Sequence, residues 1–176
     1  MNSTVILIGP LGVGKTTVGR LLAQRLDLPL CSVDAVREAY YQMVGYDQAI
    51  AAQIGASKQG IQGVLRYSKP FEAALVEKIL ADHHGIIDFG ASNSVYEDAA
   101  LFDRVANVLA PQPNVILLLP SPDLEESAAI LRHRLVAMLT AAGKDFTHEL
   151  FALNDYFIKH PSNRRLAKRI IYTKDK

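Results

Sequence analysis

The sequence predicts an α/β fold with a five-stranded parallel sheet and helices on both of its faces. Three observations lead to this prediction: five short apolar runs are spread along the chain, segments with helical periodicity separate them, and a glycine-rich stretch follows the first run. The apolar runs are continuous rather than alternating, as is typical of strands covered on both sides. Alternation of strands and helices implies right-handed crossovers and therefore a parallel sheet.

The predicted strands occupy residues 5–8, 28–33, 86–89, 115–119 and 169–172. Between them, apolar residues three or four positions apart indicate helices at 18–26, 71–80 and 124–139. The first of these apolar stripes consists of Val18, Leu21, Leu22 and Leu26.

We expect residues 1–176 to form a single domain with two additions to the alternating pattern. Residues 35–68 are longer than a simple crossover needs, and residues 143–162 are an extra piece before the last strand. Ligands of open parallel sheets bind beyond the carboxyl ends of the strands. We therefore interpret 35–68 as an acceptor-binding insertion and 132–162 as a lid region.

The composition is that of a soluble globular domain. Hydrophobic residues make up 49% of the 176 residues and the net charge is +1, so the bulk charge does not favour nucleic acid or a membrane surface as a partner. Cys31 is the single cysteine, which suits a reducing compartment. We expect a cytoplasmic protein without a signal peptide or membrane span, present as a monomer or weak dimer.

The stretch "GPLGVGKTT" at residues 9–17 matches the phosphate-binding pattern G-x-x-x-x-G-K-[ST]. Its glycines let the backbone N–H groups turn toward one anion at the start of a helix. Lys15 is expected to bind the outer phosphates and Thr16 the Mg²⁺ attached to them. The pattern thus predicts a P-loop NTPase three-layer sandwich that binds ATP and Mg²⁺ through Gly9, Leu11, Gly12, Val13, Gly14, Lys15, Thr16 and Thr17.

Two aspartates stand at the ends of predicted strands. Asp34 follows the second strand and Asp88 lies at the end of the third, and we expect both strands to be neighbours of the first. One carboxylate would accept a proton from an attacking hydroxyl and the other would hold Mg²⁺. The alternatives are a helix N-cap for Asp34 and a turn residue before Gly90 for Asp88.

At this point the chain resembles the shikimate kinase family of small P-loop kinases. The resemblance rests on GPLGVGKTTVGRLLAQRLDLPL, on SVD at 32–34, on GIIDFGAS at 85–92 and on HPSNRRLA at 160–167. The family carries D-x-D after its second strand, whereas this chain has Ser32 in the first place and Asp34 in the second. The resemblance implies that Asp34 contacts the acceptor hydroxyl.

The resemblance also implies where the acceptor and the lid would be. The family's triple glycine corresponds here to Gly90-Ala91-Ser92, and its carboxylate-binding arginines correspond best to Lys69 and Lys159, with Arg66 close enough to replace Lys69. Lysine binds a carboxylate only as a point charge, so the acceptor pocket differs from the family's. Arg132 and Arg134 fall where the family's basic lid begins, although a solvated helix face explains them equally well.

The function expected from these residues is ATP-dependent phosphoryl transfer to a hydroxyl of a small metabolite. The catalytic residues would be Lys15, Asp34, Asp88, Arg132 and Arg134, with Thr16, Asp34 and Asp88 available to the metal and Asp34, Arg66, Lys69, Gly90 and Lys159 to the acceptor. A nucleoside or nucleotide kinase is one alternative, and a non-catalytic nucleotide-binding switch is the other.

Overall fold

A computed structural model describes residues 4–145 and 147–174 of the chain. It contains one parallel sheet, as predicted, with the strands β1 (Val5–Ile8), β2 (Leu30–Ser32), β3 (Ile86–Asp88), β4 (Asn114–Leu119) and β5 (Arg169–Tyr172). The helices are α1 (Lys15–Leu26), α2 (Val33–Met43), α3 (Gln48–Ala56), α4 (Gly60–Asp82), the 3₁₀ helix η1 (Ala91–Ser94), α5 (Ala99–Leu109), α6 (Leu124–Ala141), α7 (His148–Lys159) and α8 (Pro161–Leu166).

The strand order is β2-β3-β1-β4-β5. The expectation that β2 would be a neighbour of β1 is therefore wrong, because β3 lies between the two strands. In the register of β2 and β3, Ser32 is paired with Asp88, and in the register of β1 and β3, Leu7 is paired with Asp88. Asp88 thus ends the strand that lies between β2 and β1, directly beside the position from which the glycine loop leaves the sheet.

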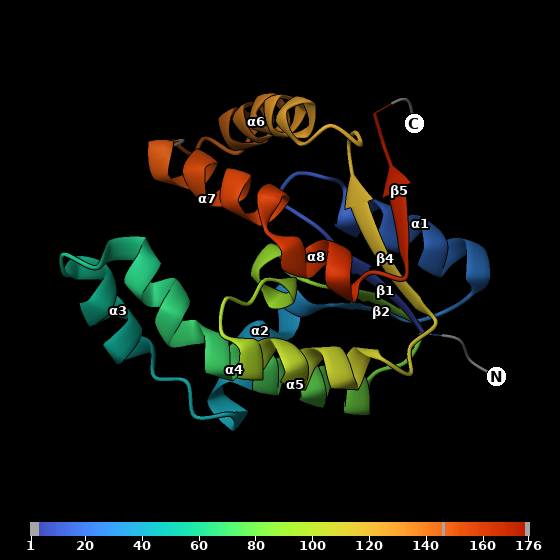
Figure 1. Cartoon of the computed structure of the whole chain (residues 1–176), viewed down its shortest axis with the longest axis horizontal. Helices are drawn as coiled ribbons and strands as arrows, with labels where there is room; N and C mark the ends of the chain where they lie inside the picture. Colours follow the sequence, from blue (N-terminus) through green and yellow to red (C-terminus); the bar gives the residue numbers. More distant parts are fainter. Residues whose placement is uncertain (1–3, 146, 175–176) are drawn as a thin grey trace.

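The sheet is covered on both faces, which confirms the predicted three layers. Ile6 and Ile8 face one side and belong to the large core cluster that includes Val76 of α4 and Val105 of α5. Leu118 faces the other side, where it packs in a cluster with Leu131 of α6. In Figure 1, α4 and α5 run along the lower side of the sheet and α6 lies above it.

Helix α1 approaches the sheet most closely at a glycine, whereas two of its leucines face solvent. Leu21 and Leu26 are 60% and 50% exposed, so the expected apolar stripe is wrong for these two residues. The buried side of α1 carries Gly19, where a Cβ atom would lie 3.2 Å from Leu30 Cδ1. Because the helix approaches the strand closely at a glycine, the periodicity of apolar residues alone does not identify the side of α1 that faces the sheet.

The predicted insertion at 35–68 is helical, and its end is not a boundary in the structure. Helix α4 continues from Gly60 through Pro70 to Asp82, so residue 68 lies inside it. Tyr46 stacks on Tyr41 at 4.3 Å between ring centroids and also contacts Phe71 of α4. These aromatic contacts fasten the α2–α3 segment to α4.

The region from 132 to 162 consists of the second half of α6, all of α7 and the start of α8. Figure 1 shows α6 and α7 side by side in the upper part of the molecule. Within the described residues, none of the helices is both long and apolar enough to cross a lipid bilayer.

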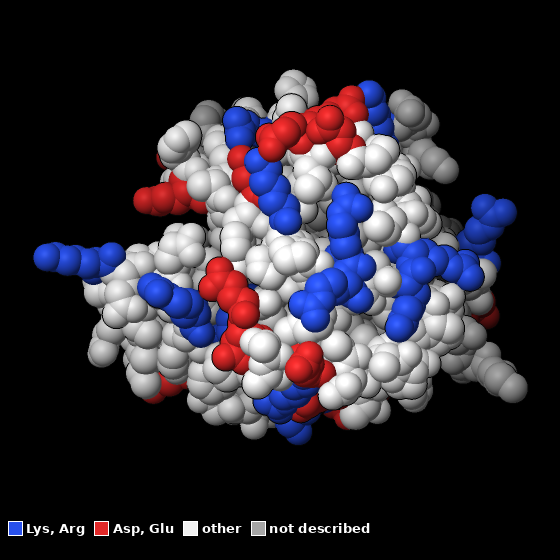
Figure 2. Space-filling view, viewed as in Figure 1, with Lys and Arg blue, Asp and Glu red and all other residues white. Residues whose placement is uncertain are grey.

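Acidic and basic side chains are interspersed over the face shown in Figure 2, and a group of basic side chains gathers over α8 and β5. This face as a whole therefore carries charges of both signs.

Candidate active site

The loop between β1 and α1 has the backbone conformation that a phosphate-binding loop needs. Gly9, Gly12 and Gly14 have φ values of +141°, +75° and +97°, a region that side chains strongly disfavour. At Gly9 a Cβ atom would lie 2.6 Å from the carbonyl oxygen of Leu118 in β4. The glycine at this position is therefore required both by its own backbone angle and by the neighbouring strand.

Lys15 is the first residue of α1, and its side chain turns back into the loop. The ammonium donates hydrogen bonds to the carbonyls of Gly9 at 2.9 Å and Pro10 at 3.0 Å, and the residue is 8% exposed. Burial lowers the pKa of Lys15, while the carboxylates of Asp88 and Asp34 act in the opposite direction. A buried cation at a helix N-terminus is a suitable partner for a polyphosphate anion.

Thr16 and Asp88 are brought together across 72 residues of sequence. The Thr16 hydroxyl donates a hydrogen bond of 2.6 Å to Asp88 Oδ2, and Asp88 is 4% exposed. Burial raises the pKa of Asp88, and the Thr16 hydrogen bond and the charge of Lys15 oppose this shift. The alternative interpretation of Asp88 as a turn residue does not fit, because it is the last residue of β3.

A hydroxyl and a carboxylate are oxygen ligands of the kind that Mg²⁺ prefers. Over residues 4–145 and 147–174, no group of three or more His, Cys, Asp or Glu side chains is arranged to hold a metal ion. A Mg²⁺ ion at Thr16 and Asp88 would thus need phosphate oxygens to complete its coordination, which is the usual arrangement for this ion.

Asp34 is close to this site but faces more solvent. It lies in the first turn of α2, whose N-cap is Ser32, so the N-cap alternative for Asp34 is wrong. Its carboxylate pairs with Arg37, and its side chain is 62% exposed. Asp34 Oδ1 also lies 2.6 Å from the position that a Cβ atom on Gly90 would occupy.

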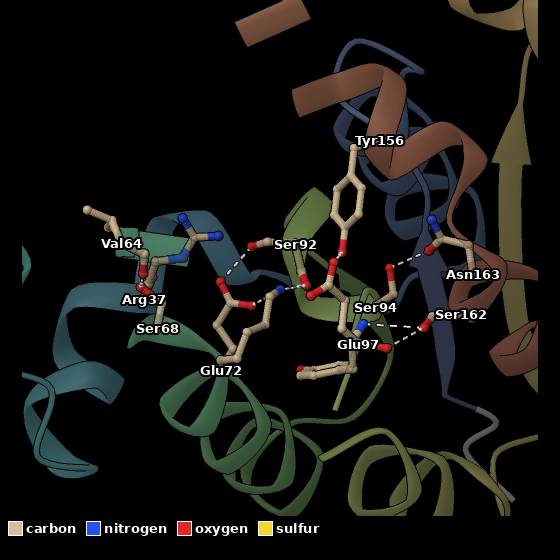
Figure 3. Close-up of polar contacts among 12 residues, drawn as sticks. Arg37, Val64, Ser68, Glu72, Ser92, Ser94, Glu97, Tyr156, Ser162 and Asn163 are labelled. Carbon is tan, nitrogen blue, oxygen red and sulfur yellow. Dashed lines mark hydrogen bonds and ion pairs between the residues drawn. The ribbon is translucent and has the colours of Figure 1, made fainter. Parts of the chain in front are cut away.

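Of the cations predicted to bind the acceptor, Lys69 is already neutralised. Its ammonium donates to Glu72 Oε2 at 2.7 Å and to the Ser92 carbonyl at 2.8 Å. The Ser92 hydroxyl donates to Glu72 Oε1 at 2.7 Å, and Figure 3 shows Ser92 and Glu72 facing each other. Glu72 is 3% exposed. A buried carboxylate of this kind requires a cation, so Lys69 serves to compensate Glu72.

The other two cations predicted to bind the acceptor, Lys159 and Arg66, lie in different parts of the structure. Lys159 pairs with Glu125 at the start of α6, at 2.5 Å. Arg66 lines a cavity of about 350 Å³ together with Lys69, and the other residues of its wall are Gln62, Leu65, Pro70, Tyr96, Glu97, Asp98, Leu101, Tyr156 and Phe157. The structure therefore does not bring Lys159 to the same place as Arg66 and Lys69.

The two arginines of the predicted lid belong to the middle of α6, which is a continuous helix. Arg132 pairs with Asp155 of α7 at 2.8 Å and lies 5.7 Å from the centroid of the Phe151 ring. It thereby joins α6 to α7, and its side chain remains 53% exposed. Arg134 is two residues further along α6, on a half-buried side of the helix.

Asn154 in α7 is a site residue that sequence reasoning missed. Its side-chain oxygen accepts a hydrogen bond from Leu11 N–H, and its side-chain nitrogen donates to the Leu11 carbonyl. In the sequence, Asn154 stands among apolar residues of the same helix, such as Leu153 and Phe157, and this pattern could have indicated a buried amide. Asn154 is only 2% exposed.

The glycine loop between β1 and α1, the buried lysine and the β-strand order together define the chain as an α/β protein of the P-loop class. A family model described as "ATPase family associated with various cellular activities (AAA)" matches residues 5–80.

Two curated relatives are shikimate kinases. The one from Rhodococcus jostii is 30% identical over 101 residues, which are 55% of this chain and 51% of the relative. The one from Saccharopolyspora erythraea is 30% identical over 117 residues, which are 66% of this chain and 57% of the relative. The chain thus spans little more than half the length of the curated relatives it matches.

Solved structures share the fold at lower identity. Shikimate kinase from Acinetobacter baumannii in complex with shikimate has a TM-score of 0.59 and 19% identity, with 98% of this chain and 84% of that chain covered. A gluconokinase from Sinorhizobium meliloti has a TM-score of 0.54 and 15% identity, with 97% and 81% covered. The chain is accordingly shikimate kinase-like in sequence and fold.

Proposed function

We propose that the protein is a P-loop kinase that transfers a phosphoryl group from ATP to a hydroxyl of a small metabolite. The observation that carries the proposal is the junction of the glycine loop with β3, where buried Lys15 lies inside the loop and Thr16 contacts Asp88. The similarity to shikimate kinases supports kinase chemistry in particular. The proposal includes the cytoplasm as compartment and a monomer or weak dimer as the working form.

In the proposed reaction, the residues of the site bind the phosphates, the metal ion and the acceptor. Lys15 and the loop amides hold the outer phosphates, and Thr16 and Asp88 hold Mg²⁺. When bound, this ion supplies positive charge that offsets the charge of the phosphates. In the transfer step the acceptor oxygen bonds to the γ-phosphorus, the bond from that phosphorus to the β–γ bridging oxygen breaks, and the hydroxyl proton passes to Asp34.

The division of labour between the two aspartates follows from their surroundings. Asp88 is buried against Lys15 and Thr16, so it belongs to the metal and the phosphates. Asp34 is more exposed and borders Gly90, which leaves room for an acceptor beside it. Arg132 or Arg134 would approach the transferred group from α6 if α6 and α7 close over the loop.

The test is ATP turnover with Mg²⁺ across a panel of hydroxylated metabolites, for the wild type, Asp34→Asn and Lys15→Ala. We expect turnover that rises only with a particular acceptor, and a loss in Asp34→Asn that is much larger for turnover than for ATP affinity. Lys15→Ala is the control for contaminating kinases. Nucleotide binding without turnover across the panel would instead indicate a nucleotide-binding switch.

A further inference from the structure

The cavity of about 350 Å³ that Arg66 lines lies between α4, the segment before α5, and α7. Its wall residues on α4 are at positions 62, 65, 66, 69 and 70, which share one face of the helix because they recur every three or four residues. Asp34, Asp88 and Gly90 do not line it, so the cavity lies outside the proposed transfer site. Small-molecule sites have volumes of about 300–1,000 Å³, a range that includes this cavity.

Three charged side chains at the cavity are not compensated by an ion pair. Within residues 4–145 and 147–174, Arg66 of α4 and the consecutive acids Glu97 and Asp98 form no salt bridge, either with one another or with other residues. Lys69 is the remaining charged group of the wall, and Glu72 compensates it. The cavity therefore has one cation and two carboxylates to which a ligand of opposite charge can bind.

Neutral donors hold the two carboxylates in place. The Tyr156 hydroxyl of α7 donates to Glu97 Oε1 at 3.0 Å, and Figure 3 shows the two side chains facing each other. Asp98 is the N-cap of α5 and accepts from Leu101 N–H at 2.9 Å. A carboxylate can accept about four hydrogen bonds, so each acid keeps its negative charge and several acceptor positions. A ligand ammonium can therefore bind to both acids without displacing either donor.

The remaining wall of the cavity is aromatic and aliphatic. Tyr96 and Phe157 are buried, Tyr156 and Leu65 are half-buried, and all four line the cavity. The three charged side chains without an ion pair are exposed, so the cavity has a charged rim and an apolar floor. Aromatic rings pack favourably against one another at an angle or with an offset. This arrangement suits a ligand that has an aromatic ring at one end and both charges at the other.

We propose that this cavity is an effector site for an α-amino acid with an aromatic side chain, whose carboxylate binds Arg66, whose ammonium binds Glu97 and Asp98, and whose ring packs on the apolar floor. A guanidinium binds a carboxylate through two parallel N–H groups, and an ammonium has three donors for the two acids. A simple acid leaves both carboxylates of the rim without a cation, and a simple amine leaves Arg66 without an anion. The binding part of this inference does not depend on the proposed kinase function.

The cavity and the phosphate loop share α7. Tyr156 and Phe157 follow Asn154, which binds both backbone polar groups of Leu11. Leu11 and Leu65 also pack against the same hydrophobic cluster, which contains Phe157. A ligand that joins α4 to α7 therefore favours the arrangement in which Asn154 holds the loop. We expect the ligand to tighten nucleotide binding, and by linkage nucleotide to tighten binding of the ligand.

The first experiment measures binding to the nucleotide-free protein by calorimetry. The probes share one ring and differ in charge: L-phenylalanine has both groups, 3-phenylpropionate lacks the ammonium, and phenethylamine lacks the carboxylate. We expect the wild type to bind L-phenylalanine about fivefold or more tightly than either of the other two, because each charged hydrogen bond contributes to affinity.

Two sets of substitutions separate the contacts of the carboxylate and of the ammonium. Arg66→Gln should remove the preference for L-phenylalanine over phenethylamine. Glu97→Gln combined with Asp98→Asn should remove the preference over 3-phenylpropionate, and the amide oxygens still accept the two native hydrogen bonds. Arg25→Gln on α1 and Glu38→Gln on α2, both at exposed positions, are the matched controls and should leave all three affinities within twofold of the wild type.

The second experiment adds Mg²⁺ and a non-hydrolysable ATP analogue. Saturating L-phenylalanine should tighten binding of the analogue to the wild type about fivefold, and Arg66→Gln should abolish this effect. L-phenylalanine has no hydroxyl other than that of its carboxyl group, so it does not fit the proposed acceptor class. The effect therefore distinguishes an effector from an acceptor.

Several results would overturn the ligand class or its location: no binding of L-phenylalanine, equal or tighter binding of either singly charged probe, or a preference that survives in Arg66→Gln. Unchanged affinity for the analogue at saturating L-phenylalanine would overturn the effector role. Failure of the wild type to bind the analogue would instead overturn the proposed kinase function, and the measurement without nucleotide would still decide which ligand the cavity binds.

Discussion

Asn154 in α7 binds both backbone polar groups of Leu11 in the glycine loop, accepting from the N–H at 2.8 Å and donating to the carbonyl at 3.2 Å. Leu11 and Asn154 are 143 residues apart in sequence. The contact ties the loop to α7 and hence to Arg132, which joins α7 to α6. The phosphate loop is therefore joined directly to the segment predicted to act as a lid.

The first prediction concerns this contact. Asn154→Leu should weaken binding of the ATP analogue several-fold and lower the free energy of unfolding by about 1–3 kcal/mol, because both groups of Leu11 lose their partner. Calorimetry and chemical denaturation measure the two effects. Glu149→Gln, at an exposed position in the first turn of the same helix, is the control; it should leave the nucleotide affinity unchanged and lower the free energy of unfolding by less than about 1 kcal/mol. Unchanged nucleotide affinity in Asn154→Leu would show that the loop does not need α7.

The second prediction concerns the glycine that begins the loop. Gly9→Ala combines a disfavoured φ of +141° with a Cβ atom 2.6 Å from the Leu118 carbonyl oxygen. We expect a loss of about 3 kcal/mol in the free energy of unfolding, measured by urea denaturation. Gly143→Ala has a φ of +63° but no atom within 4 Å, so it gives the cost of a left-handed backbone angle without a steric clash, which is about 1 kcal/mol. Equal losses in the two variants would contradict the steric argument.

The third prediction concerns the pH dependence introduced by Asp88. Burial raises its pKa in the folded protein, so the folded state binds this proton more tightly than the unfolded state. The contribution of Asp88 to stability is therefore lost as the pH rises from the ordinary aspartate value through the raised pKa.

Asp88→Asn removes this titration and keeps an oxygen that can accept from Thr16. Thermal melts of the ligand-free proteins should show the variant gaining in melting temperature relative to the wild type as the pH rises through this window. Mg²⁺-dependent binding of the ATP analogue should fall in the same variant. A difference in melting temperature that is constant with pH would mean that Asp88 does not titrate as described.

The fourth prediction concerns the loop lysine. Lys15→Ala should weaken binding of the ATP analogue roughly 100-fold, because a buried cation with charge-assisted hydrogen bonds to phosphate is lost. Lys58→Ala, at an exposed position in the α3–α4 connection, is the matched control. Normal nucleotide affinity in Lys15→Ala would refute the assignment of the phosphate loop.

Local pattern was sufficient for much of the architecture. The five strands lie where continuous apolar runs predicted them, and β1 and β5 have the predicted bounds. The glycine loop could also be recognised from the sequence, because a loop with positive φ values directly before a helix needs glycines at fixed positions. These features depend on residues that are near one another in the chain, so periodicity and backbone preference are enough to find them.

The strand order, the contact of Thr16 with Asp88 and the contact of Asn154 with Leu11 were decided only by the tertiary structure. The same holds for the contact of the half-buried Lys69 ammonium with the Ser92 carbonyl. In each case the outcome depends on which segments pack together over long sequence separations. Burial then selects the partner, because a buried charge or amide must be satisfied by whichever group the fold places beside it.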